Sequence, residues 1–169
     1  MVATSEKFIV FRAADAIDFD ASGAMSPPAP GSFDMQAASE LIEAGIGAGA
    51  DHELVFSGGG MSLARVWFKS GYPLPRHSHD CACLYYILAG ELVLGTERLG
   101  PGDGFFVEAG VPYAYFAGEA GVELLEFRAQ TRFGIQLLGM TQGWAQRAAA
   151  RVRDRSPAWA DEQRPSLRD

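Results

Sequence analysis

Two stretches decide the fold of this chain: residues 71–90, GYPLPRHSHDCACLYYILAG, and residues 102–113, GDGFFVEAGVPY. In the first stretch one residue separates His77 from His79, and alternate side chains of an extended strand share a face. Two imidazoles at that spacing can bind one metal ion if both face inward. The first stretch therefore predicts a strand that presents a pair of candidate metal ligands.

Outward from these stretches, the chain reads as a series of short strands separated by turn residues. The expected strands cover residues 53–56, 61–68, 77–88, 91–94, 104–107, 112–116 and 122–127. The chain contains 20 glycines and 9 prolines, which favour frequent turns. Many short strands at this spacing are typical of a sandwich or barrel, so we expect an all-β fold.

The two ends of the chain lack this pattern and predict short helical extensions. Residues 8–11, FIVF, are a candidate first strand, and Asp34 is a candidate cap for a helix that ends near Glu43. Residues 144–152 are rich in alanine and arginine, which favours a second helix, and the chain from about residue 156 is expected to be loose. We therefore divide the chain into an N-terminal arm with a short helix (1–52), a barrel (53–133), and a C-terminal helix with a loose tail (134–169).

Length, charge and cysteine content restrict the class of protein. The 169 residues suit one domain, and a net charge of -7 argues against binding nucleic acid or an anionic membrane surface. The two cysteines, Cys81 and Cys83, are too close in sequence for an unstrained disulfide. Free thiols, no signal-peptide pattern and no apolar run of about 20 residues lead us to expect a cytoplasmic protein.

Both quoted stretches resemble the two sequence motifs of the cupin superfamily, in the form found in small single-domain, RmlC-like cupins. The shared positions are the framing glycines and the histidine pair, namely Gly71, His77, His79, Gly90, Gly102 and Gly110. Four positions differ: Cys83 replaces a glutamate, Glu108 a proline, Tyr113 a histidine and Ala117 an asparagine. The resemblance covers about residues 53–127 and implies a double-stranded β-helix, or jelly-roll, barrel with short helical extensions.

The resemblance also implies which residues hold a metal. The ligands of metal-binding cupins, three histidines and a glutamate, fall on His77, His79, Cys83 and Tyr113 of this chain. A thiolate at Cys83 would give a ligand set suited to a divalent transition metal such as iron or zinc. The alternative is that Cys83 is a small buried hydrophobic residue and Tyr113 a pocket wall, in a site without metal.

The same resemblance implies a metal-dependent enzyme for a small-molecule substrate, for example a dioxygenase that acts on a small organic acid or aromatic. Tyr113 and Tyr85 are the candidate catalytic residues, because a phenol can orient substrate or move a proton. Trp67, Phe106 and Tyr115 are candidates for the substrate pocket. Two alternatives stay open: a non-catalytic cupin that binds a small molecule without retaining metal, and a storage barrel.

Three further polar residues and the assembly complete the expectations. His52 and Glu97 are expected in solvent, next to a strand start and a hairpin turn, whereas the sequence period does not decide which way Glu126 faces. The apolar segments 8–11 and 133–140 would leave exposed surface on a monomer, which predicts a homodimer with two-fold symmetry.

Overall fold

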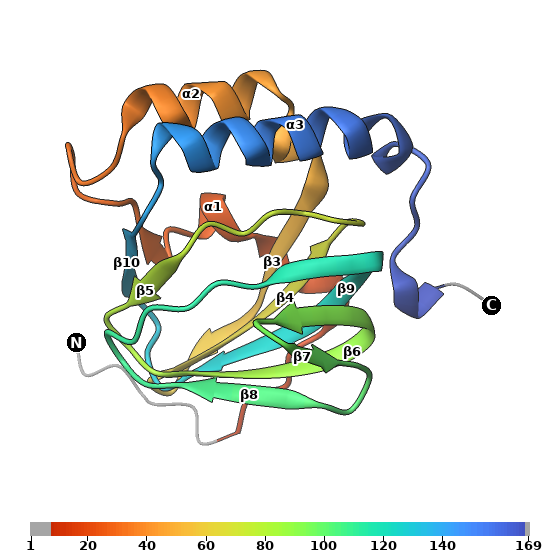
Figure 1. The fold of residues 1–169 in the computed structure, drawn as a ribbon. Coiled ribbons are helices and arrows are strands. Elements are labelled where there is room, and N and C mark those ends of the chain that lie inside the picture. The colour runs from red at the N-terminus through yellow and green to blue at the C-terminus, as the bar shows by residue number, and fades with distance from the viewer. Residues whose placement is uncertain (1–7, 168–169) are drawn as a thin grey trace.

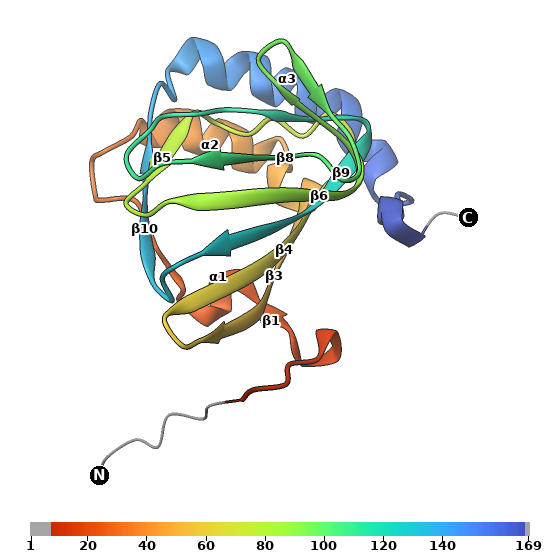
Figure 2. The same cartoon turned by 90° about the horizontal axis from the view of Figure 1, so that it is seen from below.

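Antiparallel and parallel strands form two sheets in the computed structural model, which describes residues 8–167 (Figures 1 and 2). The larger sheet contains β1 (Ile17–Asp18), β3 (Ala50–Gly58), β4 (Met61–Phe68), β6 (Cys83–Leu94), β7 (Glu97–Leu99), β8 (Gly104–Val107) and β9 (Phe116–Arg128). Its order is β1-β3-β4-β9-β6-β7, and β8 also pairs with β6. The smaller sheet contains β2 (Met25–Ser26), β10 (Phe133–Leu137) and β5 (His77–His79), in that order.

The long strands β6 and β9 bend in the middle of the larger sheet. Their pairing shifts register between Ile87 and Ala89 and again between Gly90 and Leu92. At Gly90 the backbone has φ 79°, and a Cβ there would lie 2.2 Å from the carbonyl oxygen of Gly121. Only glycine fits this close approach of the two strands without strain, so the bend depends on the closing glycine of the first motif.

The main core lies on the inner face of the larger sheet. Alternation along β9 directs Val122 and Leu124 inward, where each is 0% exposed, together with Ile87 of β6. Full burial of one such aliphatic side chain stabilises the fold by about 1.5–3 kcal/mol. Figure 2 shows β3, β4, β9, β6 and β8 following one another around this core. The all-β jelly roll that the sequence predicts is confirmed.

Three α-helices and three 3-10 turns extend the sheets. They are α1 (Phe19–Ser22), α2 (Met35–Glu43), α3 (Gln142–Trp159), η1 (Ala13–Asp15), η2 (Ile46–Gly49) and η3 (Pro165–Leu167), counted over residues 8–167. Helices α2 and α3 lie side by side above the sheets in Figure 1. The cap expected at Asp34 is present, because its Oδ1 accepts hydrogen bonds from the backbone of Gln36 and Ala37. Among the helices of the described part of the chain, none is long and apolar enough to cross a membrane.

The N-terminal segment differs from the sequence-based expectation. Residues 8–11 are exposed and form no strand, and the edge of β3 pairs instead with β1. Strands β1 and β2 belong to the expected arm but pair with β3 and β10, so the arm takes part in both sheets. Residues 1–7 and 168–169, at the two ends of the expected arm and tail, lie outside the described residues.

The C-terminal segment is also more closely packed than expected. Helix α3 continues past residue 152 to Trp159, which is 1% exposed and donates a hydrogen bond from Nε1 to the carbonyl oxygen of Ser70 at 3.0 Å. Beyond the helix, Arg164 forms ion pairs with Asp51 and Glu53. The segment 133–140 is not an exposed apolar surface, since Phe133 is 3% exposed and β10 pairs on both sides.

Candidate functional site

His77 and His79 lie side by side on the short strand β5, where both are at least nine-tenths buried. Their ring centroids are 5.0 Å apart. The Nδ1 atom of His77 lies 2.8 Å from the carbonyl oxygen of Pro75, and that of His79 lies 2.9 Å from the carbonyl oxygen of Gly134. A carbonyl oxygen only accepts, so each Nδ1 carries the proton and each Nε2 keeps its lone pair.

Burial keeps both imidazoles neutral near neutral pH. It lowers the pKa of His77, and it lowers the pKa of His79 to about 4, where the nearby Arg128 acts in the same direction. A neutral imidazole with a free Nε2 can accept a hydrogen bond, take a proton as a general base or bind a metal ion. The backbone carbonyls that hold each Nδ1 also fix the orientation of the rings.

The histidine pocket is a cavity of about 480 Å³ whose lining contains all three histidines of the chain, His52, His77 and His79. The expectation that His52 lies in solvent is wrong. Its ring stacks on Phe19 with the centroids 3.7 Å apart, and burial lowers its pKa. The sequence held one signal for this placement: His52 has the same strand parity as the buried Leu54.

A buried ion pair forms part of the wall of the histidine pocket. Glu126 and Arg128 both face inward from β9, with Nη1 of Arg128 at 2.7 Å from Oε2 of Glu126. Burial acts to raise the pKa of Glu126, but Arg128 and His52 hold it below its usual range. The Nε atom of Arg128 and the Nε2 atom of His52 are buried without a hydrogen-bond partner among the described residues. Such orphaned polar atoms are uncommon in folded proteins.

Cys83 and the two predicted catalytic tyrosines belong to the core next to the histidines. Cys83 is 2% exposed, and burial raises the pKa of its thiol to about 12. The hydroxyl groups of Tyr85 and Tyr113 are hydrogen-bonded to each other, and burial raises the pKa of both. Tyr113 also lies against His77, with ring centroids 4.4 Å apart. Near neutral pH these groups are a thiol and two phenols, which are weak metal ligands.

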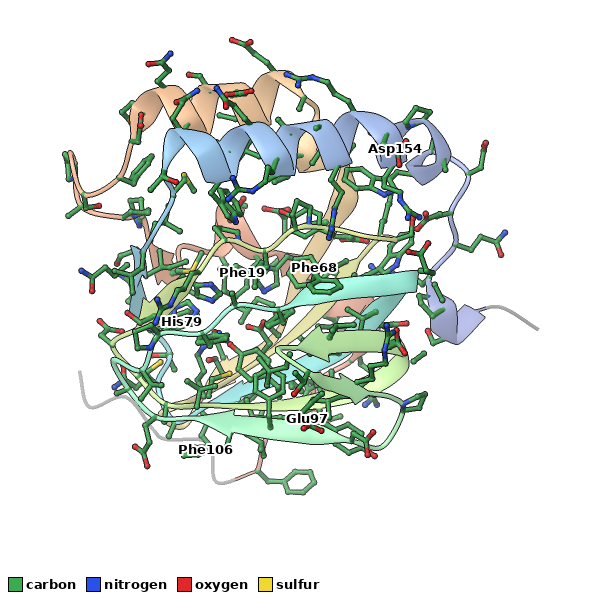
Figure 3. The ribbon with its side chains drawn as sticks, in the orientation of Figure 1. Phe19, Phe68, His79, Glu97, Phe106 and Asp154 are labelled. Atoms are coloured by element: carbon green, nitrogen blue, oxygen red, sulfur yellow. The ribbon has the colours of Figure 1, made fainter. Side chains whose placement is uncertain are left out.

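The predicted pocket residues are only partly brought together. Tyr115 lines the histidine pocket, but Phe106 is 58% exposed. Figure 3 shows Phe106 at β8, on the outer side of the sheet. Its neighbour Phe105 turns inward instead and stacks on Tyr85. Trp67 is buried on the outer side of β4 beneath Lys69, so the prediction of these two residues as pocket walls is not supported by the geometry.

The side chains of β4 that face inward are at even-numbered positions, next to Trp67 and not at it. Phe68 and Val66 face the core, and Phe68 lines the histidine pocket in place of Trp67. Figure 3 shows Phe19, Phe68 and His79 in the interior of the molecule, and Glu97 lies exposed on β7 as the sequence predicts. Within residues 8–167, no group of three His, Cys, Asp or Glu side chains is arranged so that it could hold a metal ion.

Comparisons with known proteins found similar solved structures but no similar sequence family. No family model matches the sequence, and no curated protein matches it. Among solved structures, the polyketide cyclase RemF from Streptomyces resistomycificus is 19% identical with a TM-score of 0.51, over 62% of this chain and 84% of that one. KdgF from Halomonas sp. is 20% identical with a TM-score of 0.46, over 48% of this chain and 80% of that one. An RmlC-like cupin from Shewanella frigidimarina is 23% identical with a TM-score of 0.45, over 49% of this chain and 78% of that one.

The likeness to RemF, at low identity, concerns the fold alone. The chain has a jelly-roll fold, as the two glycine-framed motifs predict. A cupin barrel supports many unrelated activities, so the function has to be argued from the side chains of the site.

Proposed function

We propose that this cupin binds a small organic acid or aromatic molecule in the histidine pocket. The observation that carries the proposal is the convergence of three neutral histidines and a buried Glu126–Arg128 pair on one cavity of about 480 Å³. That volume lies within the range of roughly 300–1,000 Å³ that is usual for small-molecule sites. Aromatic walls with a few convergent polar groups are also usual for such sites.

The chemistry of the wall restricts the ligand. The free Nε2 atoms of His77 and His79 accept hydrogen bonds, so the ligand has to supply a donor such as a hydroxyl group. Arg128 is the cationic side chain of the lining and can attract an acceptor such as a carboxylate, in competition with its partner Glu126 and with Asp18, Asp20 and Asp51, which also line the pocket. The rings of Phe19 and Phe68 offer an apolar surface to the rest of the ligand. An aromatic hydroxy acid satisfies all three requirements.

An enzymatic role follows from the same groups. A neutral imidazole beside a ligand hydroxyl can accept its proton, which raises the nucleophilicity of the remaining oxygen. In this role His77 or His79 is the general base. Tyr113, which is hydrogen-bonded to Tyr85 and packs against the ring of His77, supports that ring from the core and does not contact the ligand.

A metal-dependent enzyme is the second candidate, and the anchored Nδ1 atoms favour it. Imidazoles that bind metal through Nε2 usually donate Nδ1–H to a carbonyl or carboxylate, as both rings do here. Two donors fit an iron or zinc ion, but Cys83 is not part of the lining of the histidine pocket, and within residues 8–167 no third His, Cys, Asp or Glu side chain completes a metal site with the pair. The donor set is therefore incomplete, and we derive no dioxygenase step from it.

Calorimetric titration with the three isomeric hydroxybenzoates tests the proposal, and benzoate serves as the matched ligand without a hydroxyl group. We expect at least one isomer to bind more tightly than benzoate, and we expect its affinity to fall in His77→Ala and His79→Ala. Glu97→Gln, at an exposed position on β7, is the control variant and should bind normally.

Elemental analysis of the same samples separates the two candidates. Iron or zinc at one equivalent, lost in His77→Ala, would favour the metal enzyme. Metal-free protein that binds a hydroxybenzoate would favour the metal-independent pocket. Unchanged binding in the His77→Ala/His79→Ala double variant would contradict both.

A further inference from the structure

A second cavity of about 440 Å³ lies between helix α3 and the strands β6 and β9. We name it the α3 groove. The side chains used in the argument are four apolar ones and two arginines, namely Pro73, Val93, Phe116, Trp144, Arg147 and Arg151. The arginines line this groove and not the histidine pocket, and the three histidines line the histidine pocket and not this groove.

The charge of the α3 groove is opposite to that of the protein as a whole. The chain carries a net charge of -7, yet the lining of this groove contains two arginines and no aspartate or glutamate. Arg147 and Arg151 are four residues apart on α3, which brings both guanidinium groups to one face of the helix. Neither arginine forms an ion pair within the described residues, whereas the nearby Arg155 is paired with Glu119.

An aromatic surface borders the two arginines, of which Arg151 also helps to lower the pKa of Glu119 outside the groove. The guanidinium carbon of Arg151 lies 5.4 Å from the ring centroid of Phe116, which is 39% exposed. Trp144 stands one helical turn before Arg147 and is half-buried. A flat apolar group can therefore lie against these rings while an anionic group meets the arginines.

We propose that the α3 groove binds a carboxylate attached to a flat apolar group. Guanidinium groups match the planar carboxylate and form charge-assisted hydrogen bonds with it. The apolar rings bury the rest of such a ligand, and the groove volume is within the range of small-molecule sites. This inference does not depend on the proposed function of the histidine pocket, because different residues carry it.

Titration of the full chain with 2-naphthoate tests the inference, and 2-naphthamide is the matched ligand without charge. We expect 2-naphthoate to bind more tightly than the amide and to bind less tightly at high salt, which screens exposed charges. Arg147→Gln and Arg151→Gln should each weaken binding by about fivefold, the upper end for an exposed ion pair. Arg153→Gln, an exposed change on the same helix outside the groove, is the matched control and should bind normally.

Two further variants separate the α3 groove from the histidine pocket. Ala114 is exposed on the wall of the groove, so Ala114→Trp should fill the space and abolish binding without affecting the fold. His77→Ala should bind 2-naphthoate as the wild type does. Equal binding of the acid and the amide, unchanged affinity in the Arg147→Gln/Arg151→Gln double variant, or loss of binding in His77→Ala would each overturn the inference.

Discussion

Breaking the buried Glu126–Arg128 pair should cost far more stability than breaking an exposed pair. The two side chains are 6% and 2% exposed, and their closest charged atoms are 2.7 Å apart. Arg128→Met leaves the carboxylate of Glu126 buried without its partner, which typically costs about 3–5 kcal/mol. The change also removes the guanidinium carbon that lies 4.1 Å from the ring centroid of Phe133, a contact that contributes about 0.5–2 kcal/mol.

Urea denaturation followed by circular dichroism measures this cost as a free energy of unfolding. The exposed pair Glu91–Arg98 is the matched control, and Arg98→Met should cost at most about 1 kcal/mol. In the double variant Glu126→Leu/Arg128→Met no buried charge remains, so most of the lost stability should return. If Arg128→Met costs no more than Arg98→Met, the reasoning about this pair is refuted.

The pH dependence of the stability of Arg128→Met independently checks the direction in which Arg128 shifts the pKa of Glu126. In the wild type the pKa of Glu126 is below its usual range. The pair therefore stabilises the fold at a pH above the pKa that Glu126 has in the unfolded chain, and this stabilisation is lost as the pH falls through the pKa of the folded state. Without Arg128, burial is the main influence and raises the pKa of Glu126 above its unfolded value. The stability difference between variant and wild type should therefore shrink as the pH is lowered from about 7 to about 5.

Three other predictions concern the core, the histidines and the assembly. Leu124→Ala, at a position with 0% exposure, should lower the free energy of unfolding by about 2–5 kcal/mol in urea denaturation. Because the pKa of His79 is about 4 in the folded state, the wild type should lose stability as the pH falls from about 6.5 to about 4, and His79→Asn should lose less over that range. The predicted homodimer should appear in light scattering, and a monomeric wild type would contradict the prediction. An apolar patch on the outer sheet face includes Leu84 (48% exposed) and Phe106 (58% exposed). The double variant Leu84→Asp/Phe106→Asp should therefore be a monomer.

The sequence predicted those parts of the fold that depend on local pattern. The glycines that frame the two motifs and the short alternating segments predicted the jelly roll. Asp34 predicted the start of α2, because a capping side chain bonds to the backbone of the helix that directly follows it. The same alternation placed His77, His79 and Tyr85 on inward-facing positions. These features need no knowledge of which strand lies next to which.

The parts that the sequence missed or left open depend on contacts between distant segments. Phe105 and Phe106 are both apolar, so the period cannot choose between them; the register with Tyr85 directs Phe105 inward. The inward position of Glu126 is stabilised by Arg128, which shares its strand parity, and by proximity to His52 on β3. Trp159 is held by Ser70, 89 residues away in the chain, so a tail that looks loose in sequence packs firmly.

The most direct test of the histidine pocket is a nitrogen-15 NMR measurement of the imidazole rings, with and without a bound hydroxybenzoate. His77 and His79 should be neutral and protonated on Nδ1, because both Nδ1 atoms meet backbone carbonyls. Addition of the ligand should shift the Nε2 resonances of these two rings and leave Nδ1 protonated. Rings protonated on Nε2, or Nε2 resonances that do not respond to the ligand, would contradict a ligand site at these two imidazoles.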